Sequence, residues 1–391
     1  MNRWWFFLVP LAAVIGLAIV IRAVLGEVIL GADLYTQWVS GNALIRGDNP
    51  YSSEVTLESQ MGIYGRPAFP GEDQVAFAYP PHSNFLLLPV VWMPFHWAQA
   101  FWLALNLILL VTSVTWVYPR SHVLLRFSLI FFYPLTLALI LGNYSLTIGI
   151  ILFIGYHLLT NRKNLPRKEQ FLLGFLLALA AIKPQLTWLG LIFLLALAFR
   201  SGFRMVPISF FGSLVLMSLG FWVLIPTWPM DWIRQVIAYT GYDLGDPVIY
   251  MFLNILLPSQ TAIYAAVGLF WLTAGLTVRY FKQWWGNKIT AWSLFTWCGF
   301  ITFILHPNGI AYDQIIFYLP LAIWAFQPLV HKARGFALLW IGWLTLSWLA
   351  FVIGRWIYPP ADALPVLIFG LWLLWYVRDP SRRRPVTTGG L

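Results

Sequence analysis

Residues 4–25 read WWFFLVPLAAVIGLAIVIRAVL, a run in which Arg22 is the only charged residue. An apolar helix of about 17–25 residues can cross the hydrocarbon core of a bilayer. Across the chain of 391 residues, 60% are hydrophobic, 18% aromatic and only 10% charged. A soluble fold could not cover so much apolar surface with so few charges, and disorder needs the opposite composition. The sequence therefore predicts an all-α, polytopic integral membrane protein surrounded by membrane lipids.

Many further stretches have the same character. Comparable apolar segments lie at 97–117, 124–141, 144–160, 204–225, 259–281, 289–305, 334–353 and 363–377, and shorter ones at 169–182, 185–199 and 312–326. Residues 83–95 are apolar but too short to cross alone, so we expect a half-helix on the outer side. These segments predict about twelve transmembrane helices in a single domain, residues 1–377. A basic tail, 378–391, follows.

The distribution of charge assigns the two faces of the membrane. Cytoplasmic loops of membrane proteins carry an excess of Lys and Arg. With the N-terminus inside and twelve crossings, 18 of the 24 basic residues fall on the cytoplasmic side and 12 of the 14 acidic residues fall outside. A full crossing by residues 83–95 would invert every later loop and remove this bias. We therefore expect both termini to be cytoplasmic, and we interpret the net charge of +10 as a topology signal that implies no nucleic-acid partner.

Many of the polar residues lie on the predicted outer face. The first external loop, residues 26–82, holds half of all the carboxylates and is rich in Tyr, Gly and Pro. Loops of this length are usually functional or disordered. This one keeps aromatic and aliphatic residues, which favours an ordered loop with short helices. A second external loop, 228–256, carries further acidic and aromatic side chains.

Asp33 follows the first predicted span and is the leading candidate for chemistry. A carboxylate at the membrane boundary is partly desolvated and can act as a general base. Asp33 also precedes a plausible helix start, so it could serve as a helix N-cap. The residues alone leave both roles open. Glu27 and Asp48, in the same loop, are alternative bases.

Four more polar residues lie at the outer ends of predicted spans or in the outer loops. Lys183 interrupts an apolar run, where a charge is costly and suggests function; it could pair with a phosphate or an external carboxylate, or extend to the interface. Asn143 joins two spans, and His306 lies seven residues before Asp313. Tyr79 precedes Pro80-Pro81, which favours a helix start, and the adjacent His82 is either a substrate ligand or a solvated loop residue.

Several classes of function lack their motifs. The sequence has no Walker-type phosphate loop and no Gly-x-Gly-x-x-Gly element after a strand. The one cysteine, Cys298, excludes a disulfide framework and a Cys-based zinc site, and the six His residues are scattered. We therefore expect neither a metal nor a cofactor.

The order of these motifs resembles the family-87 glycosyltransferases of the C-type (GT-C) superfamily, which are polyprenyl-phosphate-mannose-dependent α-mannosyltransferases of bacteria. The resemblance runs through Asp33, Gly47-Asp48-Asn49-Pro50-Tyr51, Tyr79-Pro80-Pro81, Trp102-Leu103-Ala104-Leu105-Asn106, Gly142-Asn143, Ala180-Ala181-Ile182-Lys183-Pro184 and His306. It is closest over residues 27–200. Asn143 departs from the family pattern, which commonly has Gln after the Gly, but an amide is retained.

The resemblance implies a fold, a reaction and partners. It implies a GT-C-like membrane domain in a bacterial cell membrane, with an extracytoplasmic active site. The donor would be a polyprenyl-phosphate sugar and the acceptor a lipid-linked or cell-envelope glycan. Asp33 would be the general base, and the sugar would be transferred with inversion. Lys183 and His306 would hold the leaving phosphate, and Asn143 and Tyr79 would contact sugar or acceptor.

Two other classes of function compete with a mannosyltransferase. A transporter or flippase of lipid-linked sugars would also be polytopic, but such proteins often show inverted repeats and broken helices near the midplane. Here the polar residues gather at one face and no repeat is evident. A non-catalytic assembly protein is the third class.

Overall fold

The structure is a computed structural model that describes residues 5–119, 121, 123–242, 246–306, 311–317, 335–357 and 359–377. All regular secondary structure in these ranges is helical, as the sequence predicted. The expected basic tail, 378–391, and most of the expected span at 312–326 lie outside the described residues.

Five helices in the described part of the chain are long and apolar enough to cross a membrane. They are α1 (Trp5–Leu25), α4 (Phe95–Val117), α10 (Met205–Leu224), α13 (Ser259–Trp285) and α17 (Phe336–Trp356). The segment Val123–Phe131 joins α6 (Tyr133–Leu141) at a bend of 70°, and together they could form one more span. The sequence predicted an apolar segment at each of these positions.

The remaining predicted segments form shorter helices. These are α7 (Ser145–Asn161), α8 (Arg167–Ala180), α9 (Pro184–Arg200), α14 (Ala291–Ile304) and α18 (Leu364–Tyr376). Their positions agree with the predicted boundaries within a few residues. Residues 83–95 include no long helix: the 3-10 helix η1 (Pro81–Leu87) begins at Pro81 and is followed by turns.

Several long helices present apolar side chains outward. On α10, Leu216 is 72% exposed and Val223 is 83% exposed, and α13 exposes Trp271. Soluble monomers rarely expose apolar patches of this extent. Lipid is the solvent that suits such faces, so the fold supports an all-α membrane protein. Inside the bundle, α1 packs on α4 through Val14, Ala18 and two alanines of α4.

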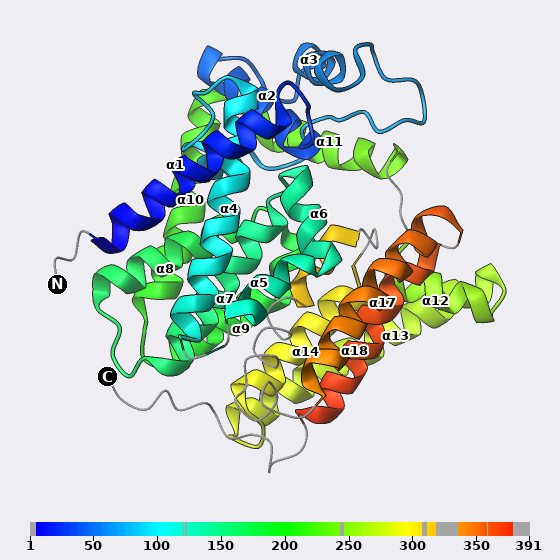
Figure 1. The fold of residues 1–391 in the computed structure, drawn as a ribbon. Helices are drawn as coiled ribbons and strands as arrows, with labels where there is room; N and C mark the ends of the chain where they lie inside the picture. Colours follow the sequence, from blue (N-terminus) through cyan, green and yellow to red (C-terminus); the bar gives the residue numbers. More distant parts are fainter. Residues whose placement is uncertain are drawn as a thin grey trace.

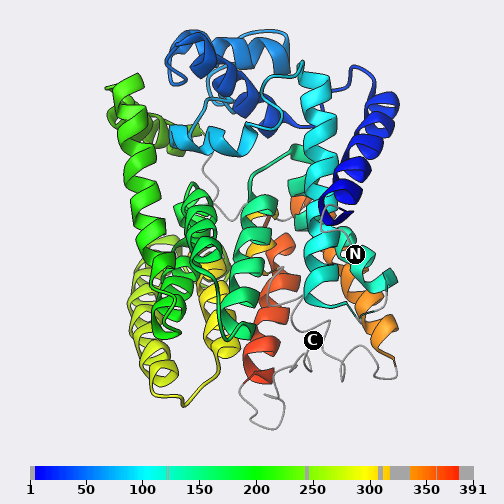
Figure 2. The ribbon, with the colours of Figure 1, turned by 90° about the vertical axis from the view of Figure 1, so that its left-hand side faces the viewer.

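Residues 26–82, predicted to form the first external loop, fold into a cap over one end of the long helices (Figures 1 and 2). Its helices α2 (Ala32–Arg46) and α3 (Ser53–Tyr64) lie at that end together with η1 and α11 (Trp228–Tyr242) (Figures 1 and 2). The Trp232 indole on α11 donates to the carbonyl of Ala78, and Asn49 donates to Asp231 at 2.8 Å. These bonds join the two external loops that the sequence predicted.

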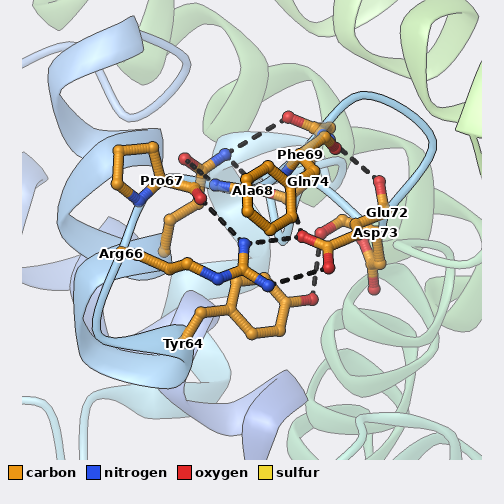
Figure 3. A network of polar contacts seen from close by, with 9 residues as sticks. Tyr64, Arg66, Pro67, Ala68, Phe69, Glu72, Asp73 and Gln74 are labelled. Carbon is orange, nitrogen blue, oxygen red and sulfur yellow. Dashed lines mark hydrogen bonds and ion pairs between the residues drawn. The ribbon is translucent and has the colours of Figure 1, made fainter.

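An ion pair orders the part of the cap that follows α3. The Arg66 guanidinium donates two parallel hydrogen bonds to the Glu72 carboxylate, each 2.9 Å long, and stacks over the Phe69 ring at 3.9 Å (Figure 3). Bidentate pairs of this kind fix geometry as well as charge. The expectation of an ordered loop with short helices is confirmed.

Candidate active site

Asp33 lies in the first turn of α2 but does not cap it. The helix begins at Ala32, its N-cap is Gly31, and no side chain forms a capping hydrogen bond. The alternative that Asp33 is the N-cap is therefore wrong. Its Oδ2 atom instead accepts a hydrogen bond of 2.6 Å from the Asn143 amide. Within the described residues, Oδ1 of Asp33 accepts no hydrogen bond.

Close backbone packing brings these two residues together. Gly142 ends α6 with a φ of +69°, and a Cβ there would lie 2.5 Å from the Cβ of Leu34 on α2. Only glycine permits both that conformation and that approach. The Gln99 side chain of α4 accepts hydrogen bonds from the backbone N–H groups of Leu30 and Gly31, each 2.9 Å long. The N-terminus of α2 is thus held against α4 and the α6–α7 junction.

The Asn143 amide is fixed in one orientation. Its Oδ1 accepts hydrogen bonds from the Ser145 N–H at 2.9 Å, the Ser145 hydroxyl at 2.7 Å and the Lys183 ammonium at 2.9 Å. Because donors surround the oxygen, the NH₂ group must face Asp33. Asn143 therefore connects the carboxylate of Asp33 to the charge of Lys183.

Lys183 is buried, with 3% of its surface exposed, at the N-terminus of α9. Its ammonium lies 2.8 Å from the Asp313 carboxylate and 2.8 Å from the Ser145 hydroxyl. The alternative that Lys183 extends to the membrane interface is therefore wrong. Lys183 pairs instead with Asp313, a carboxylate in a segment that the sequence predicts to be external. The other oxygen of Asp313 lies 3.2 Å from Nε2 of His306, which is also buried.

Asp313 is the residue that sequence reasoning missed as part of the site. The signal was available: a Lys inside an apolar run requires a counter-charge, and Asp313 follows His306 in a segment predicted to be external. The separation of Lys183 and Asp313 in sequence hid their pairing.

Tyr79 faces this network from the cap. Its ring lies 5.9 Å from the Lys183 ammonium, and its carbonyl accepts a hydrogen bond from the Tyr51 hydroxyl. The pKa of the Tyr79 hydroxyl lies well above its ordinary value because burial, Asp33 and Asp313 raise it, while Asn143 and Gln37 oppose the shift. All five predicted site residues therefore gather in one place.

The competing residues are placed differently. Glu27 is 75% exposed and pairs with Arg22 and His96, and Asp48 is 52% exposed and pairs with Arg46. Both carboxylates are therefore exposed to solvent and form ion pairs of their own. The alternative that His82 is a solvated loop residue is wrong, because it is buried in η1, and burial lowers its pKa to about 4.

The electrostatics of Asp33 suit proton transfer. Burial raises its pKa to about 6, although the Asn143 hydrogen bond and the Lys183 charge act in the opposite direction. A base is most effective when its pKa lies near the working pH. Within the described ranges, no group of three or more His, Cys, Asp or Glu side chains could hold a metal ion.

Comparison with known families decides the class of this protein. The model of glycosyltransferase family 87 matches residues 77–307, more than half of the chain. The chain belongs to glycosyltransferase family 87. It is accordingly a membrane glycosyltransferase. Tyr79, Asn143, Lys183 and His306 lie inside the matched range, whereas Asp33 and Asp313 lie outside it. The comparisons found no matching curated protein and no matching solved structure.

Proposed function

We propose that this glycosyltransferase transfers a hexose from a polyprenyl-phosphate donor to a lipid-linked or cell-envelope glycan, and that the hexose is mannose. One observation carries the proposal. A continuous network joins a half-buried carboxylate, Asp33, through Asn143 to the buried cation Lys183. An inverting transfer needs a base at one end of the reacting bond and positive charge at the other, and this network supplies both.

Asp33 acts as the general base in this proposal. Its Oδ1 takes the proton from an acceptor hydroxyl while that oxygen attacks the anomeric carbon of the donor. The bond from the anomeric carbon to the phosphate breaks on the opposite face, so the configuration inverts. With a pKa of about 6, Asp33 is ionised at neutral pH and can perform this step.

Lys183 and His306 hold the departing phosphate. Positive groups placed before the reaction stabilise the charge that develops on a leaving group. Asp313 balances Lys183 before the donor enters and contacts His306 through its second oxygen. Tyr79, whose ring lies over the Lys183 ammonium, contacts the sugar or the acceptor.

Asn143 takes a different role from the one expected. Protein partners already occupy its NH₂ group and its oxygen. We therefore assign Asn143 to orienting the Asp33 carboxylate, not to binding the substrate. This role leaves Oδ1 of Asp33 directed away from the amide and available to an acceptor.

The same proposal places the reaction on the outer face of a bacterial cell membrane, with twelve crossings and cytoplasmic termini. The charge bias between loops supports this topology. The cap that carries Asp33 lies at one end of the long helices, as an external loop would (Figure 2).

The test uses the purified full-length protein in detergent with radiolabelled polyprenyl-phosphate mannose and a lipid extract of the host envelope. Transfer of label to an acceptor without any ion gradient supports the proposal. Binding of the donor, or its flipping in vesicles, without transfer would indicate the transporter class instead. Transfer from a nucleotide sugar alone would identify a different donor.

A further inference from the structure

The side chain of Gln37 is buried beside the site without a well-placed partner. It lies on α2 four residues after Asp33, so the two side chains share one face of the helix. Gln37 is 1% exposed, and neither its Oε1 nor its Nε2 has a partner at full hydrogen-bond geometry. The Tyr79 hydroxyl is close enough for the amide to lower its pKa, but it is not placed to satisfy both ends of the amide. A buried amide without partners is costly and uncommon in native proteins.

Two nearby glutamines show what a structural role requires. The Gln99 oxygen accepts from two backbone N–H groups, and its NH₂ group donates to the carbonyl of Val28. The Gln60 NH₂ group donates to the Gln74 carbonyl, and its oxygen accepts from the Ala68 N–H. Both amides are satisfied at each end, so the fold explains them. It does not explain Gln37.

The surroundings of Gln37 indicate the kind of ligand it suits. Its neighbour Tyr79 also approaches Asp33 and Asn143. The hydroxyls of the fully buried Ser83 and Tyr144 also have no partner at full hydrogen-bond geometry, although the two lie close to each other. The Tyr144 ring packs edge-on against Tyr79 at 5.3 Å. Polar atoms that the protein leaves without a well-placed partner therefore gather around Tyr79, next to the proposed base.

We propose that Gln37 binds two neighbouring hydroxyl groups of the sugar that reacts at Asp33. This inference rests on the proposed function. An amide presents one acceptor and two donors side by side, and each hydroxyl can both donate and accept. A hydroxyl pair therefore satisfies both ends of Gln37. A phosphate would leave the amide oxygen unpaired, and it is expected at the cationic end of the network, beyond Asn143.

The hydroxyl pair can belong to the donor sugar or to a sugar acceptor. The kinetic test separates them with the variant Gln37→Met, which keeps the length of the side chain but removes both polar ends. With radiolabelled polyprenyl-phosphate mannose varied at fixed envelope-lipid extract, a donor contact raises the KM for the donor. With the extract varied at fixed donor, an acceptor contact raises the KM for the acceptor.

The expected loss is about 5- to 100-fold in kcat/KM for the substrate that Gln37 holds, as two neutral hydrogen bonds are removed. The unliganded variant should also melt at a higher temperature than the parent, because a buried unpaired amide has gone. The matched control is Gln60→Met, which removes a satisfied amide. It should melt at a lower temperature and leave both KM values unchanged.

A second variant guards against a folding defect. Gln37→Asn keeps the amide chemistry but withdraws it by one methylene, and it should also lose kcat/KM. Parental kinetics in both Gln37 variants would overturn the inference while leaving the proposed function intact. If the parent protein itself fails to transfer mannose, the proposed function falls and this inference falls with it.

Discussion

Replacing Asp33 by Asn tests the proposed base with two independent measurements. Asn keeps the size of the side chain and can still accept the hydrogen bond from Asn143, but it cannot take a proton. General-base contributions are typically about 10²–10⁴ in rate. We therefore expect Asp33→Asn to bind donor normally and to transfer sugar at least about 10²-fold more slowly.

The same substitution should increase stability at high pH. Burial raises the pKa of Asp33 from 3.8 to about 6. A carboxyl with a higher pKa in the folded state contributes stability that is complete below its unfolded pKa and is lost as the pH rises through the folded value. At about 1.4 kcal/mol per pH unit, that loss reaches roughly 3 kcal/mol at pH 8. Asp33→Asn should therefore be more stable than the parent by up to roughly 3 kcal/mol at pH 8, and equally stable at pH 3.

The assay combines initial rates of transfer with thermal unfolding between pH 3 and 8. The parental rate should rise about tenfold per pH unit below 6 and level off above it. Glu27→Gln and Asp48→Asn are the matched controls, since both carboxylates are exposed and should retain activity. If Asp33→Asn keeps more than about a tenth of parental activity while either control is inactive, we have named the wrong carboxylate. If all three variants stay active, the acid–base mechanism itself is refuted.

Three further predictions concern the topology, the ion pair and the close packing of the site. In a protein whose native Cys298 is replaced, the variants Lys163→Cys and Asp48→Cys are labelled with a membrane-impermeant thiol reagent. The first should react only from the cytoplasmic side and the second only from outside. Labelling of both from one side would exclude the twelve-crossing topology. Lys183→Gln should cost about 3–5 kcal/mol of stability, because Asp313 is left buried and unpaired. Lys183→Gln combined with Asp313→Asn should recover most of that stability but still lose about 10- to 150-fold in kcat/KM for the donor, whereas parental donor kinetics would remove Lys183 from phosphate binding. Gly142→Ala should lower the melting temperature and the transfer rate together, since α2 must move away from the α6–α7 junction; a parental melting temperature would show that the approach is not tight.

The helices were predictable because lipid imposes a simple rule on the sequence. A backbone in hydrocarbon must satisfy its own hydrogen bonds, so every apolar stretch of sufficient length becomes a helix. The predicted stretch 4–25 became α1 (Trp5–Leu25), and 204–225 became α10 (Met205–Leu224). The same rule does not predict the conformation of residues 83–95, which are too short to span the bilayer. Their short length argued against a span, but only the structure shows the 3-10 helix and turns.

The partners within the site could not be predicted because they depend on packing between distant segments. The amide of Asn143 reaches Asp33 only because a glycine lets α6 end against α2. An Asp near the start of a helix suggests capping, since Asp is one of the residues preferred at the N-cap. Here Gly31 occupies that position, and the carboxylate is free to turn toward Asn143.

The pairing of Lys183 with Asp313 bears on how the donor must bind. A lone buried ammonium would be too costly to keep before the donor arrives, so the fold supplies a carboxylate of its own. If Lys183 binds the donor phosphate, as we propose, that phosphate has to compete with Asp313 for a cation that already has three protein partners. His306 stands at the other oxygen of Asp313, where it can keep that carboxylate paired as Lys183 turns toward the phosphate. Lys183 also donates a hydrogen bond to the Asn143 oxygen. A movement of its ammonium would therefore change the hydrogen bonds of the amide that orients Asp33. In the proposed mechanism, donor binding and the orientation of the base are therefore linked through the Asn143 amide.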